Sequence, residues 1–240
     1  MTFAQTDFSF CPVLEEMIAT GGAVDASGNL HSAFGLSTVN NLIVLRNLQM
    51  ELKAAATLEI GLSMGASALV LAQSHKDLGH SPAAQHVAID PWQVAYLNSL
   101  GLHAFTRAGL HPYLDFIDKT SDLALPRLLE QGRRFGLIYV DGSHWFEDVF
   151  IDCHYSNHLL ELGGVVLFDD SSDPNIAQVL RFIRRNMGYA LTEIDLSAYR
   201  ADLGKSLRYR IGRAADRVQL TAFRKIGDGR RPIENKTRPF

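Results

Sequence analysis

Glycine and carboxylate residues stand close together at one point of this chain, in a pattern suited to binding a small molecule. Residues 58–67, Leu-Glu-Ile-Gly-Leu-Ser-Met-Gly-Ala-Ser, are typical of a buried strand, a glycine turn and the start of a helix. Gly61 and Gly65 permit positive φ and a close approach of the backbone to a ligand, and the start of the helix points free N–H groups toward that ligand. Glu59 adds a hydrogen-bond acceptor at the end of the strand. The segment therefore predicts a cradle for a small molecule.

The glycine pattern also bears on which molecule is bound. Dinucleotide-binding proteins use a similar turn with the motif G-x-G-x-x-G. That motif would require glycine at positions 63 and 66, where this chain has Ser63 and Ala66. The difference disfavours a site for pyrophosphate.

Polar residues also follow the other predicted strands, at the edge where an open parallel sheet binds its ligands. Four of the first five predicted strands end in a carboxylate. Asp90 ends the second of them, and one carboxylate can accept hydrogen bonds from two adjacent ribose hydroxyls. Trp92 either lies along a purine face or packs within the protein, and Ser121 either binds the base or caps the helix that follows. Both pairs of interpretations are open.

Three further carboxylates follow two strands that we expect to be neighbours. They are Asp141, Asp169 and Asp170. Clustered carboxylate oxygens hold Mg²⁺ or a similar divalent cation, with water or substrate in the other octahedral positions, and the cation offsets their mutual repulsion. In the alternative interpretation, Asp169 caps a loop, Asp170 is solvated and Asp141 binds an amine of the ligand.

His144 lies on the loop directly after Asp141. A histidine at this place can take a proton from a hydroxyl whose acidity a metal has raised. We therefore predict that His144 is the general base, and we interpret the other eight histidines as structural.

These residues must be positioned by an alternation of short β-rich runs and amphipathic helical stretches. Strands are expected at 57–60, 86–90, 114–117, 135–141, 165–168, 190–194 and 219–224. Helices are expected at 37–52, 66–78, 92–100, 123–131, 146–162 and 175–187. In the helix 146–162 a predicted core stripe consists of Phe146, Val149, Phe150, Cys153 and Leu160. The alternation predicts an α/β fold, a Rossmann-like, doubly wound and mostly parallel sheet of seven strands with helices on both faces.

The ends of the chain differ from this alternating part. We interpret residues 1–36 as an N-terminal arm or lid made of a helix, a turn and an irregular segment, 37–226 as the ligand-binding domain and 227–240 as a flexible tail.

Composition restricts the classes of function. With 240 residues and 47% hydrophobic residues, one large domain is expected. A formal net charge of −3 disfavours nucleic acid as a partner, and two cysteines fit a reducing compartment. The N-terminus lacks the pattern of a secretory signal, and no apolar run approaches the roughly 20 residues that cross a bilayer. We expect a cytoplasmic protein without membrane contact, and we leave open whether it forms a homo-oligomer.

Taken together, four segments resemble a class I S-adenosylmethionine-dependent methyltransferase. They are Glu59-x-Gly61-x-x-x-Gly65-x-Ser67, Asp90-Pro91, Asp141-Gly142-Ser143-His144 and Gly163-Gly164-x-x-x-x-Asp169-Asp170. The resemblance spans about residues 40–225. Within the class, the segment from Asp141 to Val149 and the double aspartate look like the small-molecule branch that includes macrocin-type sugar O-methyltransferases.

The resemblance implies a role for each matching residue. Glu59, Gly61, Gly65 and Ser67 would line the methionine part of the cofactor, Asp90 would bind its ribose, Ser121 would lie near the adenine, and Asp141 would stand beside the sulfonium. Apart from the resemblance, we also count Ser63 and Trp92 among the predicted cofactor-binding residues. Asp141, Asp169 and Asp170 would bind the metal, and His144 matches the position of the base. One departure is Gly136, where the family commonly has Asp.

The expected reaction is an in-line methyl transfer to an oxygen of a small acceptor such as a sugar, a polyol or a phenol. Positioning would supply most of the acceleration, while the cation orients the hydroxyl and His144 removes its proton. Two alternatives belong to other classes: a protein that binds S-adenosylmethionine without catalysis, and an NAD-dependent oxidoreductase. Ser63 and Ala66 disfavour the second of these.

Overall fold

The computed structural model describes residues 7–32, 36–200, 211–212, 218–234 and 236–240. Its described residues contain one seven-stranded sheet in the order β5-β4-β3-β6-β7-β9-β8. The strands are β3 (Thr57–Ile60), β4 (His86–Ile89), β5 (Leu114–Ile117), β6 (Phe135–Val140), β7 (Leu160–Phe168), β8 (Leu191–Glu193) and β9 (Thr221–Lys225). The first five are parallel to one another, whereas β9 runs antiparallel to both β7 and β8. The predicted mostly parallel sheet is confirmed.

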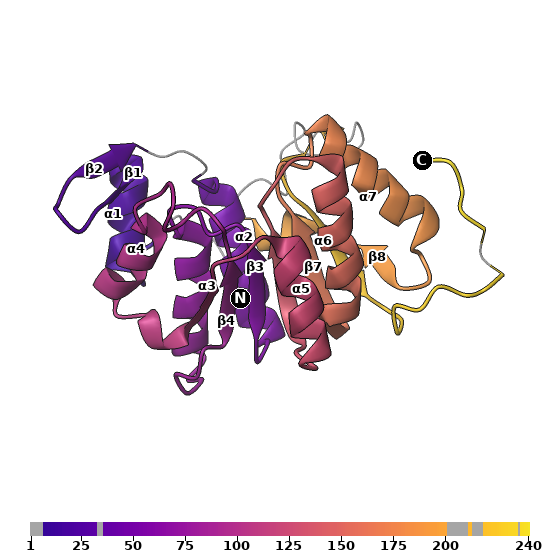
Figure 1. The fold of residues 1–240 in the computed structure, drawn as a ribbon, viewed down its shortest axis with the longest axis horizontal. Coiled ribbons are helices and arrows are strands. Elements are labelled where there is room, and N and C mark those ends of the chain that lie inside the picture. The colour runs from indigo at the N-terminus through magenta and orange to yellow at the C-terminus, as the bar shows by residue number, and fades with distance from the viewer. Residues whose placement is uncertain (1–6, 33–35, 201–210, 213–217, 235) are drawn as a thin grey trace.

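Helices cover both faces of this sheet (Figure 1). On one face lie α1 (Pro12–Thr20), α2 (Val39–Leu52), α3 (Ala66–Asp77) and α4 (Leu100–Ala108), and on the other α5 (Ser121–Glu130), α6 (Phe146–Leu159) and α7 (Pro174–Asn186). Alternate residues of a strand point to opposite faces, so Leu137 and Tyr139 of β6 pack with the first group and Ile138 and Val140 with the second. The doubly wound fold is therefore confirmed.

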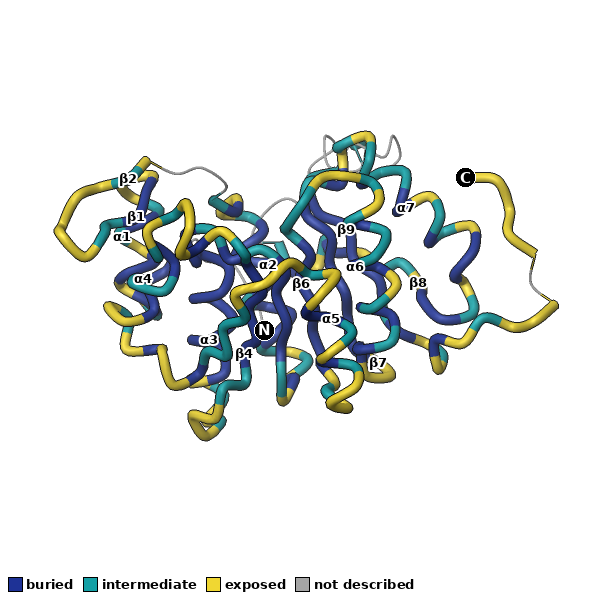
Figure 2. Tube along the Cα trace, in the orientation of Figure 1, coloured by how far each residue is buried: buried dark blue, intermediate teal, exposed yellow. Residues whose placement is uncertain are grey.

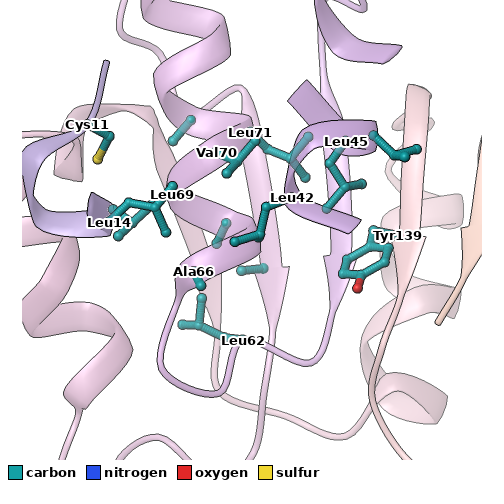
Figure 3. Packing of buried hydrophobic residues seen from close by; sticks show 14 of the residues in the cluster. Cys11, Leu14, Leu42, Leu45, Leu62, Ala66, Leu69, Val70, Leu71 and Tyr139 are labelled. Carbon is teal, nitrogen blue, oxygen red and sulfur yellow. The ribbon is translucent and has the colours of Figure 1, made fainter. Parts of the chain in front are cut away.

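Burial follows these layers. The strands of the sheet form the buried centre of the molecule, and the exposed residues gather in loops and on outer helix faces (Figure 2). On the first face, side chains of α1, α2 and α3 interlock above the sheet, where Leu14, Leu42 and Leu69 are fully buried (Figure 3). The packing holds the segment between β3 and α3 in one position, and that segment carries the glycine turn.

The predicted helix at 92–100 is wrong. Residues 92–97 form turns, in which the N–H groups of Tyr96 and Leu97 both donate to the carbonyl of Trp92. Asn98 and Ser99 then adopt positive φ of 46° and 57°, which ends any helical run. The helix α4 begins only at Leu100, and its buried residues include Leu100, Gly101, Ala104 and Phe105. Their helical spacing was a signal in the sequence for the correct position.

The predicted helix at 146–162 is too long, because α6 ends at Leu159. Leu160 opens β7, where it pairs with Phe135 of β6, so this member of the predicted core stripe is buried in a strand. The buried Lys225 of β9 donates from Nζ to the carbonyl oxygens of Asn157 and Leu160, at 2.6 and 2.8 Å. These hydrogen bonds satisfy carbonyl groups at the end of the helix.

The N-terminal segment contains more regular structure than the sequence analysis predicted. After α1 follows a hairpin of β1 (Gly22–Val24) and β2 (Leu30–Ser32). Asp25 holds its turn, because its Oδ1 accepts hydrogen bonds from the N–H groups of Ser27 and Asn29. Val13, Leu14 and Met17 of α1 belong to the core cluster on the first face. The proposed role of this segment as a lid stays a prediction.

Described residues of the C-terminal segment contact α6 and α7. The carbonyl of Gly229 accepts a hydrogen bond from Asn157, and the carbonyls of Arg238 and Pro239 accept from Asn186 and Arg185. Phe240 lies against Phe182 of α7, with ring centroids 5.0 Å apart. These contacts give the tail a defined path beside α7.

A buried acid between α5 and α6 makes stability depend on pH. Asp152 of α6 is 1% exposed, and burial raises its pKa from 3.8 to about 7. Between these values the folded state holds one more proton than the unfolded state, so stability falls as pH rises. We expect Asp152→Asn to remove this loss, so that its unfolding free energy relative to wild type rises by up to about 4 kcal/mol from pH 4 to pH 8. Chemical unfolding at both pH values measures the difference.

The exposed Glu147 on the same helix provides the control. Glu147→Gln should track the wild type at both pH values, since its carboxylate is solvated folded and unfolded. If the unfolding free energy of Asp152→Asn changed with pH as it does in the wild type, the raised pKa would not belong to Asp152.

Candidate active site at the carboxyl end of the sheet

The glycine turn after β3 lies against the end of β6. Gly61 has φ of +94°, and a Cβ built on it would lie 2.1 Å from the carbonyl oxygen of Asp141. The two strand ends are held at this distance because the N–H of Asp141 donates to the carbonyl of Ile60. Gly65 has φ of +88° and directly precedes α3. Both glycines are therefore required by the backbone, as predicted from their types and spacing.

Asp90 organises the turn from the side of β4. Its Oδ2 accepts hydrogen bonds from the N–H groups of Leu62 and Ser63, at 3.1 and 2.8 Å, and its Oδ1 accepts from Trp92 at 2.7 Å. Gln93 also donates to Oδ2, at 3.2 Å. The carboxylate thus fixes both loops of the cradle, a function that the sequence analysis did not assign to it. Its contact with a ribose stays a prediction.

Glu59 lies beneath the turn and is fully buried. Ser67 donates its hydroxyl to Oε1, while Oε2 lies 3.2 Å from Nε2 of His86. Burial, with a smaller contribution from the charge of Asp90, raises the pKa of Glu59 to about 8. Glu59 and Ser67 are thus brought together as predicted, and His86 is an additional neighbour.

The strands β6 and β7 are paired, so their ends bring three carboxylates together. Asp141 follows β6, and Asp169 and Asp170 follow β7. Burial raises the pKa of Asp141 well above 3.8, and the charges of Asp169, Glu59 and Asp170 add to the effect. The ion pairs between described residues include no lysine or arginine at Asp141, Asp169 or Asp170. Among the described residues, His144 is therefore the basic side chain that is paired with this cluster, through Asp170.

Asp169 is the most strongly hydrogen-bonded of the three. Its Oδ1 accepts from Asn41 of α2 at 2.7 Å and from Gln219 at 3.2 Å, and its Oδ2 accepts from the hydroxyl of Tyr139. Ser37 donates to Asp141 at 3.3 Å from the same side. Four residues of the site were not predicted from the sequence: Ser37, Asn41, Tyr139 and Gln219. Only the position of Tyr139 near the end of a strand was visible in the sequence.

Asp141, His144 and Asp170 lie close enough together for their side chains to contact one cation. One ligand atom from each lies within 4.8 Å of the other two. Nε2 of His144 is 3.2 Å from Oδ2 of Asp170, and the carbonyl of His144 accepts a hydrogen bond from Asn175 of α7 at 3.0 Å. Asp169 is outside this group, so its direct contact with a metal stays a prediction.

Aromatic side chains stand exposed around this edge of the sheet. Trp92 is 54% exposed and packs edge-on against Tyr96, and Trp145 beside His144 is 69% exposed. Ser121 is the first residue of α5 and faces the buried Asp152 of α6. The predicted contacts of Trp92 and Ser121 with an adenine stay predictions.

A comparison with protein families identifies the part of the chain that carries this site. Residues 58–171 match the family model described as a methyltransferase domain. The matched range begins in β3, contains the glycine turn and Asp90, and ends just after the double aspartate. This part of the chain is a methyltransferase domain. The predicted resemblance to a methyltransferase is confirmed for these residues.

Solved structures share the fold of this chain at low sequence identity. An O-methyltransferase from Bacillus cereus in complex with S-adenosylhomocysteine is 18% identical, with a TM-score of 0.60 over 76% of this chain and 82% of that chain. The O-methyltransferase TomG from Streptomyces achromogenes, involved in tomaymycin synthesis and bound to S-adenosylmethionine, is also 18% identical. Its TM-score is 0.60 over 93% of this chain and 92% of that chain. A putative O-methyltransferase from Klebsiella pneumoniae is 18% identical, with a TM-score of 0.57 over 78% of this chain and 82% of that chain.

A further comparison and a search for membrane spans gave negative results. No curated protein matches the chain. Within the described residues, none of the helices combines the length and the apolar character needed to cross a bilayer.

Proposed function

We propose that the methyltransferase domain transfers a methyl group from S-adenosylmethionine to a hydroxyl of a small molecule, assisted by a divalent cation. The observation that carries this proposal is the shared position of Asp141. Its backbone carbonyl lies against Gly61 of the cradle, and its carboxylate belongs to the group with His144 and Asp170. A sulfonium held by the cradle and a hydroxyl held at the acidic group would therefore be neighbours.

The donor set of the acidic group fits a hard divalent cation. Carboxylate oxygens suit Mg²⁺ or Mn²⁺, and a single imidazole does not exclude either. Asp141 and Asp170 are the two ligands that we assign, because Oδ1 of Asp169 is already shared between Asn41, Gln219 and the N–H of Asp170. A bound cation supplies Lewis acidity that lowers the pKa of an acceptor hydroxyl.

The protein groups would then perform two tasks. The cradle of Glu59, Gly61, Ser63, Gly65 and Ser67 would hold the methionine part of the cofactor, and Asp90 its ribose, so that the sulfonium methyl faces the acidic group. His144 would accept the proton of the acceptor hydroxyl on its imidazole ring, which lies beside Asp170. Positioning of the two reactants would account for most of the acceleration.

Binding and transfer are tested in sequence. Calorimetry with S-adenosylhomocysteine should show one site, and NAD should give no heat. Purified protein with methyl-labelled S-adenosylmethionine, Mg²⁺ and a panel of sugars, polyols and catechols should then yield S-adenosylhomocysteine, and chelation of the metal should stop it. As a control, Gly61→Ala should lose the cofactor, because its Cβ would collide with the carbonyl of Asp141.

The outcomes separate the alternatives. Cofactor binding without any product from the panel would favour a protein that binds S-adenosylmethionine without catalysis. Heat from NAD alone would favour an oxidoreductase. If product still forms after chelation of the metal, the proposed methyl transfer stands but the proposed role of the cation is wrong.

A further inference from the structure

A continuous chain of hydrogen-bonding side chains runs from the cofactor cradle through the core to the surface. It begins at Glu59, whose Oε2 lies 3.2 Å from Nε2 of His86. Nδ1 of His86 is 2.9 Å from the hydroxyl of Thr57, which is also 2.9 Å from Nε2 of His75. Nδ1 of His75 lies 2.8 Å from Nδ1 of His80. The chain crosses the layer between the sheet and α3 without a gap.

The members of the chain differ in exposure in a way that suits a path to solvent. Glu59, Thr57, His75 and His86 have 0% exposed surface, whereas His80 in the turn after α3 is partly exposed. The ring of His86 is held parallel to that of Phe105, with centroids 6.5 Å apart. The buried members are therefore fixed in place and shielded from water, and only the last one reaches the surface.

The hydrogen bonds of the chain can all point in either direction. Burial lowers the pKa of both His75 and His86 to about 3, so each ring is neutral and has one N–H and one lone pair. The hydroxyl of Thr57 also donates once and accepts from its other side. If Glu59 is ionised, each group donates its hydrogen bond to the neighbour on the Glu59 side. If Glu59 is protonated, each group donates to the neighbour on the His80 side. Both arrangements satisfy all the links.

If the proposed function is correct, binding of the cofactor requires a path by which a proton can leave the buried Glu59. At neutral pH the raised pKa of about 8 keeps the Glu59 carboxyl mainly protonated. The charge of Asp90, after β4, also disfavours its ionisation. A cofactor ammonium beside Glu59 would instead favour ionisation, and a proton would then have to leave a fully buried group.

We propose that Thr57, His75, His80 and His86 are a proton relay that carries this proton from Glu59 to solvent when the cofactor binds. The Glu59 carboxyl gives its proton to Nε2 of His86, and His86 passes its Nδ1 proton to the hydroxyl of Thr57. Thr57 passes its own hydroxyl proton to His75 Nε2, and His75 passes its Nδ1 proton to His80 Nδ1. His80 releases a proton from Nε2 to water, so that one proton leaves and Glu59 carries one negative charge.

The relay is tested by timing the release of the proton. The protein is mixed with S-adenosylhomocysteine in weakly buffered solution near pH 7, where a pH-indicator dye reports protons and tryptophan fluorescence reports binding. In the wild type we expect the proton to appear together with binding. In Thr57→Val the shape is kept and the hydroxyl is lost, so release should lag binding at least about tenfold, because the proton must wait for local opening of the core.

Three further variants complete the test. Thr57→Ser keeps a hydroxyl and should release the proton as fast as the wild type. His80→Phe closes the surface end without altering the core and should slow release as Thr57→Val does. Glu59→Gln should reduce the number of protons released on binding, measured by calorimetry in buffers of different ionisation enthalpy, from about one to near zero.

The results distinguish failure of the relay from failure of the proposed function. If S-adenosylhomocysteine does not bind, the proposed function is wrong and the relay has no purpose. If it binds but no proton is released, or if Thr57→Val and His80→Phe release it as fast as the wild type, the relay is wrong and the proposed function is unaffected. Thermal melting of Thr57→Val shows separately how much the hydroxyl contributes to stability.

Discussion

Replacing Asp170 by asparagine is expected to lower the rate of methyl transfer at least about 100-fold, because the cation loses a charged ligand that stabilises the developing alkoxide. The fold should be unaffected. Asp170 has φ of 43°, a conformation that asparagine adopts readily, and an asparagine oxygen can still accept a hydrogen bond from Gln219. The affinity for S-adenosylhomocysteine should stay within about twofold, because this side chain lies outside the cradle.

Two measurements check the result. Initial rates with labelled cofactor give the loss of turnover, and a titration with Mn²⁺ should show weaker binding of the metal. Asp228→Asn, at an exposed residue beyond β9, should match the wild type in both. A variant at position 170 with full rate and unchanged affinity for Mn²⁺ would refute the role of the cation.

Replacing His144 by glycine is expected to lower kcat by about 10²–10⁴-fold, the usual contribution of a general base. The loss should arise in the chemical step, so the affinity for S-adenosylhomocysteine should change little. Added imidazole should restore part of the activity, since it can accept the proton in the space that the side chain leaves. Initial rates with and without imidazole measure the effect.

The same variant separates a base from a metal ligand. His144 lies within ligand distance of Asp141 and Asp170, so the geometry alone permits both roles. If His144 acts as the base, the affinity for Mn²⁺ should be unchanged in the variant, whereas a ligand would show weaker metal binding. His111→Gln, at an exposed histidine at the start of the 3₁₀ helix His111–Tyr113, is the control and should retain full activity.

The limits of four strands of the sheet could be predicted closely from the sequence. The strands β3 and β5 have the predicted limits, and the limits of β4 and β6 differ by one residue at the carboxyl end. Such strands are short continuous apolar runs between turn signals, and that pattern is local in the sequence. The prediction failed between β4 and α4, because the conformation there depends on the contact of Asp90 with Leu62 and Ser63 of another loop.

Some residues of the candidate site could be predicted from a local sequence pattern, and others could not. Glu59, Gly61 and Gly65 were visible in one short segment, since a turn of this type requires its glycines close together. Asn41 and Gln219 are 128 and 50 positions away from Asp169, and no local pattern connects them. His86 and Thr57 were interpreted only as a structural histidine and a strand residue. Thr57 lies between His75 and His86 because β3 pairs with β4 while α3 packs above the sheet.

The amino-acid sequence by itself determined the alternation of strands and helices, the glycine turn and the acidic strand ends, because each of these depends on residues a few positions apart. The pairing of β6 with β7 decided that Asp141 and Asp170 meet with His144, and that Asp169 is instead held by Asn41 and Tyr139. The tertiary structure also decided that a line of polar side chains connects Glu59 with the surface. Hydrogen bonds between separate elements depend on distances that only the packed sheet and helices set.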